Sequence, residues 1–366
     1  MRVGVPKEIK VHEYRVGLTP ASVAELVAAG HDVIVETKAG TGIDFDDQAY
    51  VDVGATIAAD AAEVFAKSDM IVKVKEPQAQ EIALLESRHT LFTYLHLAAD
   101  KPQAEGLMKS GATCIAYETV TAHDRSLPLL KPMSEVAGRM SIQVGAHYLE
   151  KEQGGRGVLL GGVPGVAPAR VTILGGGIAG VNAAQMAVGM RADVTIYDIS
   201  NARLAELDMF FGSQIKTAYA SKAAVAHAVA NSELVIGAVL IPGAAAPKLV
   251  TRDMLPTMKR GSVLVDISID QGGCFETSRP TTHSDPVYEI DGVIHYCVAN
   301  MPGAVARTSA FALNNATLPF VLKIANQGAD AAMAADPHLA NGLNVSGGKI
   351  RHKAVAEALD LPFEAA

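Results

Sequence analysis

The sequence predicts an α/β protein made of two doubly wound, Rossmann-like domains with a cleft between them. The chain has 366 residues, which is long for a single hydrophobic core and favours two domains. Short runs rich in β-branched residues alternate with helix-like segments, as in parallel sheets covered by helices on both faces. This alternation occurs twice along the chain, so each series predicts one domain.

The first series occupies residues 1 to about 130. Its strand-like runs are short and apolar, and most are followed by a segment with helical character. In chain order the segments are RVGVP, PASVAELVAAG, DVIVET, DAAEVFAKS, MIVKVK, TLFTYLHL, KPQAEGLMKSG and TCIAYETV. Residues 1–130 are therefore expected to form one doubly wound domain.

A helical stretch connects the two series. From Met133 the sequence MSEVAGRMSIQVGAHYLEKEQGGRG ends in glycines, as a helix stop does. The second series then runs through RVTILGGG, AGVNAAQMAVGM, DVTIYD, a region around KTAYAS, SELVIGAVL, GSVLVDISID and VIHYCVAN. Residues 131–304 are expected to form this second domain.

The segment from Ala304 to about Gln327 is apolar and long enough for a buried helix, despite Pro319 near its middle. From its length we expect it to return to the first domain. Residues 305–366 would then complete the first domain, and the second domain would be an insertion within it.

Composition and charge argue against several classes of protein. Apolar residues make up 49% of the chain and charged residues 19%, which is ordinary for a globular protein. The formal net charge is -8 and no cluster of Lys and Arg stands out, so nucleic acid is not the expected partner. The longest uncharged apolar run, residues 234–247, is too short to span a bilayer and contains prolines.

Cysteine usage and the start of the chain favour a cytoplasmic protein. Cys114, Cys274 and Cys297 are odd in number and widely spaced, so they predict neither a disulfide framework nor a paired redox motif. The opening MRVGVPKEIK has no charged-then-apolar leader. No H-x-x-H, H-E-x-x-H or paired-Cys spacing marks a metal site, so no metal is expected.

A glycine motif follows the first strand-like run of the second domain. Gly175, Gly177 and Gly180 have G-x-G-x-x-G spacing, and Asp198 stands 18 residues past Gly180 at the end of the next strand. In dinucleotide-binding folds such glycines let the backbone approach a pyrophosphate, and the carboxylate accepts the ribose hydroxyls. The glycines alone could serve packing, but strand, glycines, helix and acid together predict a dinucleotide site.

Asp198 also bears on which dinucleotide binds. A carboxylate at this position would repel a 2′-phosphate, so NAD is favoured over NADP. The nearby Arg203 argues in the other direction, because arginine is the residue that accepts that phosphate. FAD is a weaker alternative, because the motif stands mid-chain beside a separate α/β domain. The sequence nevertheless leaves FAD open.

Candidate chemical residues follow from a rule of open α/β sheets, in which ligands bind beyond the carboxyl ends of strands. At those positions stand Arg15, Lys75 and His96 in the first domain, and Asp270, Asn300 and Met301 in the second. A nicotinamide enzyme acting on a small amino or keto acid must anchor a carboxylate, polarise a carbonyl or imine, and move protons. Arg15 suits the first task and Lys75 the second. His96 and Asp270 suit the third.

Each candidate also has a purely structural alternative. The two cations could be exposed solubilising charges, and a lone histidine is more often hydrogen-bonded within a core. Asp270 and Asn300 stand close before glycines and could form turns. Met133 could simply fill the core.

Six stretches together resemble the alanine dehydrogenase family, and the resemblance covers almost the whole chain. They are VGVPKEIKVHEYRVGLTP, VKVKEP, TYLHLA, KPMSEVAGRMSIQVGAHYLEK, ILGGGIAGVNAAQMAVGM and DISIDQGGCFETSRPTTHSDPVY. Long agreement across both domains is far more specific than the glycine motif. The wider family includes the NAD(H)-binding part of proton-translocating transhydrogenase and, more distantly, saccharopine-forming enzymes.

The resemblance implies a reversible oxidative deamination in which L-alanine, water and NAD become pyruvate, ammonium and NADH. It implies that Arg15 holds the substrate carboxylate and Lys75 the carbonyl oxygen, with Met133 lining the pocket. His96 and Asp270 would be the acid–base residues. The implied cofactor-binding set is Ser134, Gly175, Gly177, Gly180, Asp198, Arg203, Asn300 and Met301. Family members are typically homo-hexamers, and that is the assembly expected here.

Other functions stay open at this point. An NAD(H)-binding module that passes hydride to a partner domain fits the fold and the glycines equally well, but leaves the four chemical residues without a substrate. A related amino-acid dehydrogenase with a larger substrate would be distinguished by pocket volume. A purely structural protein is the remote alternative, which the intact nucleotide motif contradicts.

Overall fold

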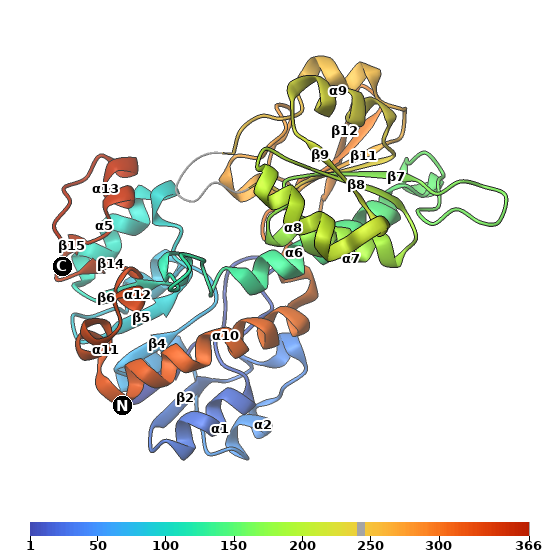
Figure 1. The fold of residues 1–366 in the computed structure, drawn as a ribbon. Helices are drawn as coiled ribbons and strands as arrows, with labels where there is room; N and C mark the ends of the chain where they lie inside the picture. The colour runs from blue at the N-terminus through green and yellow to red at the C-terminus, as the bar shows by residue number, and fades with distance from the viewer. Residues whose placement is uncertain (240–245, 366) are drawn as a thin grey trace. The chain divides into compact units, whose positions relative to one another are not determined.

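The computed structural model describes residues 1–239 and 246–365. The chain divides into two compact units (Figure 1). The first unit consists of Met1–Met133 with Gly303–Ala366, and the second of Ser134–Pro302. The C-terminal segment therefore belongs to the same compact unit as the N-terminal third.

The described part of the first unit contains an eight-stranded sheet in the order β15-β14-β6-β5-β4-β1-β2-β3. Its strands are β1 (Arg2–Val5), β2 (Asp32–Glu36), β3 (Thr56–Ala58), β4 (Met70–Val72), β5 (Thr90–Thr93), β6 (Thr113–Ala116), β14 (Leu343–Ser346) and β15 (Lys349–Ile350). Strands β1 to β6 pair in parallel, whereas β14 pairs antiparallel with β6 and β15 antiparallel with β14. The α/β fold class is confirmed, and two short C-terminal strands add antiparallel pairs at the β6 edge of the otherwise parallel sheet.

The helices of the first unit range from 4 to 22 residues in length. They are α1 (Pro20–Ala28), α2 (Asp47–Val51), α3 (Ala61–Lys67), α4 (Ala79–Ile82), α5 (Lys101–Ser110), α10 (Ala306–Gln327), α11 (Ala329–Ala335), α12 (Pro337–Ala340) and α13 (Lys353–Leu359). For α5, the Asp100 side chain caps the N-terminus by accepting from the N–H of Gln103, and Gly111 ends the helix with a φ of 71°. Capping and termination of this kind are readable in a sequence.

Helix α10 tolerates its internal proline and packs against α1 (Figure 1). Pro319 is exposed, whereas the buried Asn314 five residues earlier accepts from the N–H of Thr19 over 2.8 Å and from the hydroxyl of Ser22 over 2.8 Å. These two hydrogen bonds join the C-terminal segment to the first turn of α1.

The second unit has a seven-stranded sheet, within the residues described, in the order β12-β13-β11-β10-β7-β8-β9. The strands are β7 (Arg170–Leu174), β8 (Asp193–Asp198), β9 (Lys216–Tyr219), β10 (Leu234–Gly237), β11 (Val263–Asp266), β12 (Val287–Ile290) and β13 (Val293–Tyr296). All pair in parallel except β12, which forms an antiparallel edge on β13. The strand expected over SELVIGAVL ends at Gly237, and Leu240 lies outside the described residues.

Helices α6 (Lys131–Tyr148), α7 (Ile178–Gly189), α8 (Asn201–Phe211) and α9 (Lys222–Asn231) accompany this sheet. Helix α6 begins two residues before the expected start at Met133. Gly138 lets α6 approach α7 closely, since a Cβ there would lie 2.2 Å from the carbonyl oxygen of Ala179. Among the described residues, no helix is both long and apolar enough to cross a membrane.

Candidate functional site

The glycine turn joins β7 to α7, and its three motif glycines are required for different reasons. Gly175 adopts a φ of +102°, a conformation that side chains disfavour. A Cβ on Gly180 would lie 1.9 Å from the carbonyl oxygen of Gly175, so this glycine allows helix and turn to pack. Gly177 has neither reason: its φ is -70° and a Cβ there would meet nothing within 4 Å.

The open space at Gly177 fits a bound pyrophosphate. Gly177 is the N-cap of the 12-residue helix α7, and no side chain caps that end. Backbone N–H groups at such a helix start attract phosphate, and the absence of a Cβ lets the phosphate come close. The turn therefore has the features that a dinucleotide-binding turn requires.

Asp198 ends β8 beside this turn and is held by two backbone donors. Its Oδ2 accepts from the N–H of Gly176 over 2.8 Å, and its Oδ1 accepts from the N–H of Ser200 over 2.9 Å. Arg203 lies on α8, where its Nε donates to the carbonyl oxygen of Gly176 over 2.7 Å. Its Nη1 pairs with Glu206 at 2.6 Å, a partner that the sequence reasoning missed.

Asp270 does not close a strand, contrary to expectation. Strand β11 ends at Asp266, and Asp270 is an exposed residue of the short 3-10 helix Ile267–Gln271. Asp266 is fully buried and accepts from the N–H of Ser268 over 3.0 Å and of Cys274 over 2.9 Å. Burial raises the pKa of Asp266, although these donors and Ser278 oppose the rise. The missed Asp266 thus holds the loop that carries Asp270.

Asn300 and Met301 also stand beyond their strand, since β13 ends at Tyr296. Asn300 has a φ of 61° and its carbonyl oxygen lies 3.1 Å from Nε2 of His283. Met301 is buried and begins the 3-10 helix Met301–Val305. Ser134 is half-buried on α6.

In the first unit, Arg15 is a buried cation rather than a solubilising charge. Its exposed fraction is 2%, its Nε donates to Oε1 of Glu13 over 2.6 Å, and its Nη2 pairs with Oε2 of the same carboxylate. Burial alone would lower the pKa of Arg15, but Glu13 outweighs it and raises that pKa. Nη1 contacts the sulfur of Met133 at 3.0 Å. Glu13, which the sequence reasoning missed, fixes the plane of this guanidinium.

Lys75 lies just beyond β4 and is buried as well. Its backbone N–H is 3.3 Å from Oε1 of Glu8, and its carbonyl oxygen accepts from the Thr93 hydroxyl at the end of β5 over 3.0 Å. Glu8 also pairs with the fully buried Lys73 at 3.1 Å. The backbone of Lys75 is therefore held from two sides.

His96 stands three residues past Thr93, where β5 ends, so the observed strand is shorter than the one expected from the sequence. Its φ of 51° is left-handed, an unfavourable conformation for a residue with a Cβ. Its N–H donates to Oε1 of Glu118 over 2.6 Å, and its ring stacks on Tyr94 with centroids 5.7 Å apart. Glu118 follows β6 and holds the histidine in place.

Tyr94 links these residues into one cluster. Burial raises its pKa, while the charge of Arg15 acts in the opposite direction, which places the phenol near that guanidinium. Arg15, Met133, Tyr94 and His96 therefore share one region of the first unit, near the carboxyl end of β5. Tyr94 and Glu118 also follow strands, so the same positional rule could have found them.

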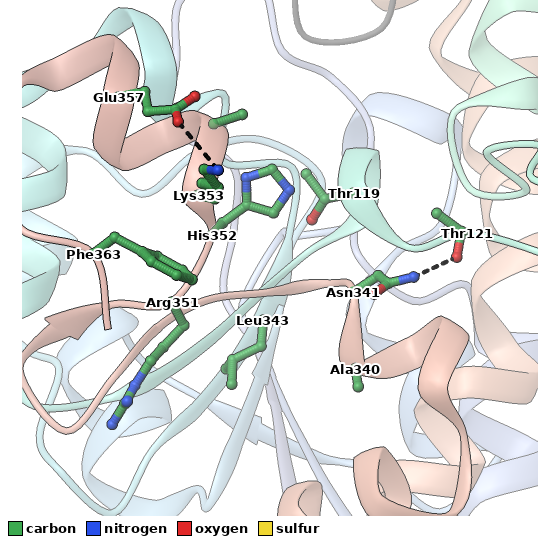
Figure 2. A pocket seen from close by; sticks show the side chains of 11 residues that line it. Thr119, Thr121, Ala340, Asn341, Leu343, Arg351, His352, Lys353, Glu357 and Phe363 are labelled. Atoms are coloured by element: carbon green, nitrogen blue, oxygen red, sulfur yellow. Dashed lines mark hydrogen bonds and ion pairs between the residues drawn. The ribbon is translucent and has the colours of Figure 1, made fainter. Parts of the chain in front are cut away.

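A separate hollow lies near the C-terminus, as Figure 2 shows. It has a volume of about 630 Å³ and is lined by residues that include Thr119, Asn341, His352, Lys353 and Phe363. None of its lining residues is among the candidates named above. In the described ranges, no group of three or more His, Cys, Asp or Glu side chains is arranged to hold a metal ion.

Fold and glycine turn together define a dinucleotide-binding α/β protein of two domains. Two family models match the chain: alanine dehydrogenase/PNT, N-terminal domain, over residues 4–137, and alanine dehydrogenase/PNT, C-terminal domain, over residues 141–353. The chain belongs to the alanine dehydrogenase/PNT family. It is an oxidoreductase with NAD as its cofactor.

Individual relatives match over nearly their whole length. The chain is 60% identical over 363 residues to an alanine dehydrogenase of Halomonas elongata and 55% identical over 363 residues to one of Mycolicibacterium smegmatis, covering 99% of this chain and 98% of each relative. A solved L-alanine dehydrogenase structure superposes with a TM-score of 0.95 at 54% identity, covering 98% of this chain and 99% of that one. A transhydrogenase from Sinorhizobium meliloti gives a TM-score of 0.83 at 27% identity, covering 97% and 100%.

Proposed function

We propose that this chain catalyses the reversible oxidative deamination of L-alanine, in which L-alanine, water and NAD give pyruvate, ammonium, NADH and a proton. The full-length similarity to proteins named alanine dehydrogenase carries the proposal, because it extends through both units at 53% to 60% identity. Identity to the transhydrogenase structure is about half as high, at 27%. That difference favours the dehydrogenase over a hydride-passing module.

Arg15 and Lys75 form the substrate-binding part of the proposal, with Met133 as a wall of the pocket. The planar guanidinium of Arg15 suits a carboxylate, and Glu13 sets its orientation before substrate arrives. The ammonium group of Lys75 can stabilise negative charge that develops on the substrate oxygen. Because Glu13 already neutralises much of the Arg15 charge, recognition depends on orientation as well as on net charge.

His96 and Asp270 are the proposed acid–base residues. An imidazole ring can both accept and donate a proton, so His96 can take a proton from the attacking water and return it to the departing ammonia. The strained backbone of His96 supports a functional role, since such strain collects at active sites. Bound NAD supplies the acceptor for the hydride of the alanine Cα. Ser134, Asn300 and Met301 are assigned to its nicotinamide end.

The glycine turn and Asp198 with Arg203 are assigned to the pyrophosphate and adenosine ribose. Residues 131–304 would thus form the NAD-binding domain, and residues 1–130 with 305–366 the substrate domain. A homo-hexamer in the cytoplasm is the proposed assembly and location. Exposed apolar side chains on the second unit, such as Leu159, Val163 and Val166, support contact with further copies.

The first experiment follows NADH absorbance with pyruvate and ammonium, then with pyruvate alone, and repeats both with NADPH. Ammonium-dependent oxidation of NADH is the expected result. If the protein binds NADH but consumes none, the dehydrogenase proposal fails and the hydride-passing module replaces it. Light scattering on a sizing column tests the hexamer.

A further inference from the structure

One cation lies at the ribose end of the nucleotide site, and its charge is already compensated. Arg203 is bonded through Nε to the carbonyl oxygen of Gly176, whose N–H donates to Asp198. One helical turn further along α8, Glu206 accepts from Nη1 of Arg203 over 2.6 Å. The guanidinium therefore lies between the glycine turn and a second carboxylate.

Asp198 and Arg203 lie on the same side of Gly176. A Cβ on that glycine would be 3.2 Å from Oδ2 of Asp198 and 3.5 Å from Cγ of Arg203. An arginine beside the ribose carboxylate is the group that accommodates the 2′-phosphate in NADP enzymes. This chain has that arginine, Arg203, although its cofactor is NAD. A further feature is therefore needed to explain why Arg203 does not favour the 2′-phosphate.

We propose that Glu206 is a specificity-determining residue that supports Asp198 in excluding NADP. Glu206 holds one guanidinium nitrogen of Arg203 and neutralises its charge, so Arg203 cannot offer a full positive fork to a 2′-phosphate. Glu206 acts through Arg203 and is thus a positioning residue. The inference rests on the proposed function, in which Asp198 receives the ribose of NAD.

The exposure of the pair sets the size of the effect. The side chains of Arg203 and Glu206 are 36% and 64% exposed, so their attraction is screened by water and salt. Exposed pairs of this kind correspond to a change of about two- to fivefold in an equilibrium constant. The effect should shrink as ionic strength rises.

Equilibrium binding of NADH and NADPH to the purified full chain, followed by nucleotide fluorescence, tests the proposal without depending on turnover. Glu206→Gln should lower the ratio of Kd for NADPH to Kd for NADH by about two- to fivefold at low salt. The affinity for NADH itself should stay within about twofold, as expected for a residue that does not contact this ligand. Glu206→Asp keeps the negative charge and should give the same ratio of Kd values as the unsubstituted chain.

Asp208 provides the matched control, because Asp208→Asn removes the same charge from an exposed residue of the same helix, two positions on and hence on another face. It should leave the ratio unchanged. In an Asp198→Asn background, Glu206→Gln should add its gain, and Arg203→Gln should abolish that gain.

Three results would overturn the inference: an unchanged ratio in Glu206→Gln, an equal shift in Asp208→Asn, or a gain that survives the loss of Arg203. Each differs from failure of the proposed function. A chain that turns over alanine with NAD but shows an unchanged ratio loses only this inference. A chain whose ratio shifts in Glu206→Gln but that turns over no alanine or pyruvate loses only the proposed function, and one that binds neither nucleotide loses both.

Discussion

The two units build their candidate sites from different materials. The nucleotide turn of the second unit is mostly backbone: Gly177 leaves open space at the start of α7, and Asp198 is held by backbone N–H groups. The candidate substrate region of the first unit is made of buried side chains, with Arg15 paired to Glu13. Changes in the first unit should therefore act through charge, and changes at the turn through shape.

The charge pair of the first unit should give the greatest loss. Arg15→Met removes the guanidinium that pairs with the buried Glu13 carboxylate, which should lower the free energy of unfolding by about 3–5 kcal/mol. Urea denaturation followed by circular dichroism measures this free energy of unfolding. The double variant Glu13→Gln/Arg15→Met removes both charges and should recover much of the stability while staying inactive. Equal stability of the single and double variants would contradict this account.

His96→Ala should lower kcat by about 100-fold or more, because an acid–base group is lost. Its backbone strain would remain, so stability should change little. Initial rates with saturating pyruvate, ammonium and NADH measure it. His123→Ala changes an exposed histidine of the same unit and is the control. Near-normal turnover in His96→Ala would remove that role.

Two of the three motif glycines, Gly177 and Gly180, should separate ligand binding from packing. Gly177→Ala should weaken NADH binding by about tenfold with an unchanged melting temperature, since a Cβ there meets only the space kept for the pyrophosphate. Gly180→Ala should lower both the affinity for NADH and the melting temperature, because its Cβ would collide with the carbonyl oxygen of Gly175. Fluorescence titration and thermal melts distinguish them. A large drop in melting temperature for Gly177→Ala would refute the distinction.

An ion pair closer to the surface should matter least. The hydrogen bond from Lys323 is the main cause that lowers the pKa of Asp336 below its usual range, so this pair stabilises the fold above the ordinary pKa of Asp. The contribution is lost as the pH falls through the lowered pKa. Asp336→Asn keeps an oxygen to cap α12 and should cost under about 1 kcal/mol at pH 7. Unfolding curves at several pH values should show this difference shrinking in acid.

Much of the fold was predictable because local signals carry it. The alternation of apolar strand-like runs with helix-like segments predicted the α/β class, which is confirmed. Strand ends were less accurate: His96, Asp270 and Asn300 all stand three or four residues beyond their strands. Apolar residues continue past the last ladder hydrogen bond, so composition alone cannot locate the end of pairing.

The partners of the candidate residues were not predictable in the same way. Glu13 could have been suspected from its position two residues before Arg15. Glu8 and Glu118 meet Lys75 and His96 only because separate loops converge at one end of the sheet. Such contacts join residues 22 to 67 positions apart, and no local pattern encodes them.

The amino-acid sequence was sufficient for the fold class, the glycine turn, the choice of NAD and the family, because each depends on short-range spacing or on resemblance along the chain. The mixed edges of both sheets, the burial of the Glu13–Arg15 pair and the hydrogen bond from Arg203 to Gly176 became visible only in three dimensions. Burial and hydrogen bonding depend on which distant segments meet, and that is a property of the packed chain.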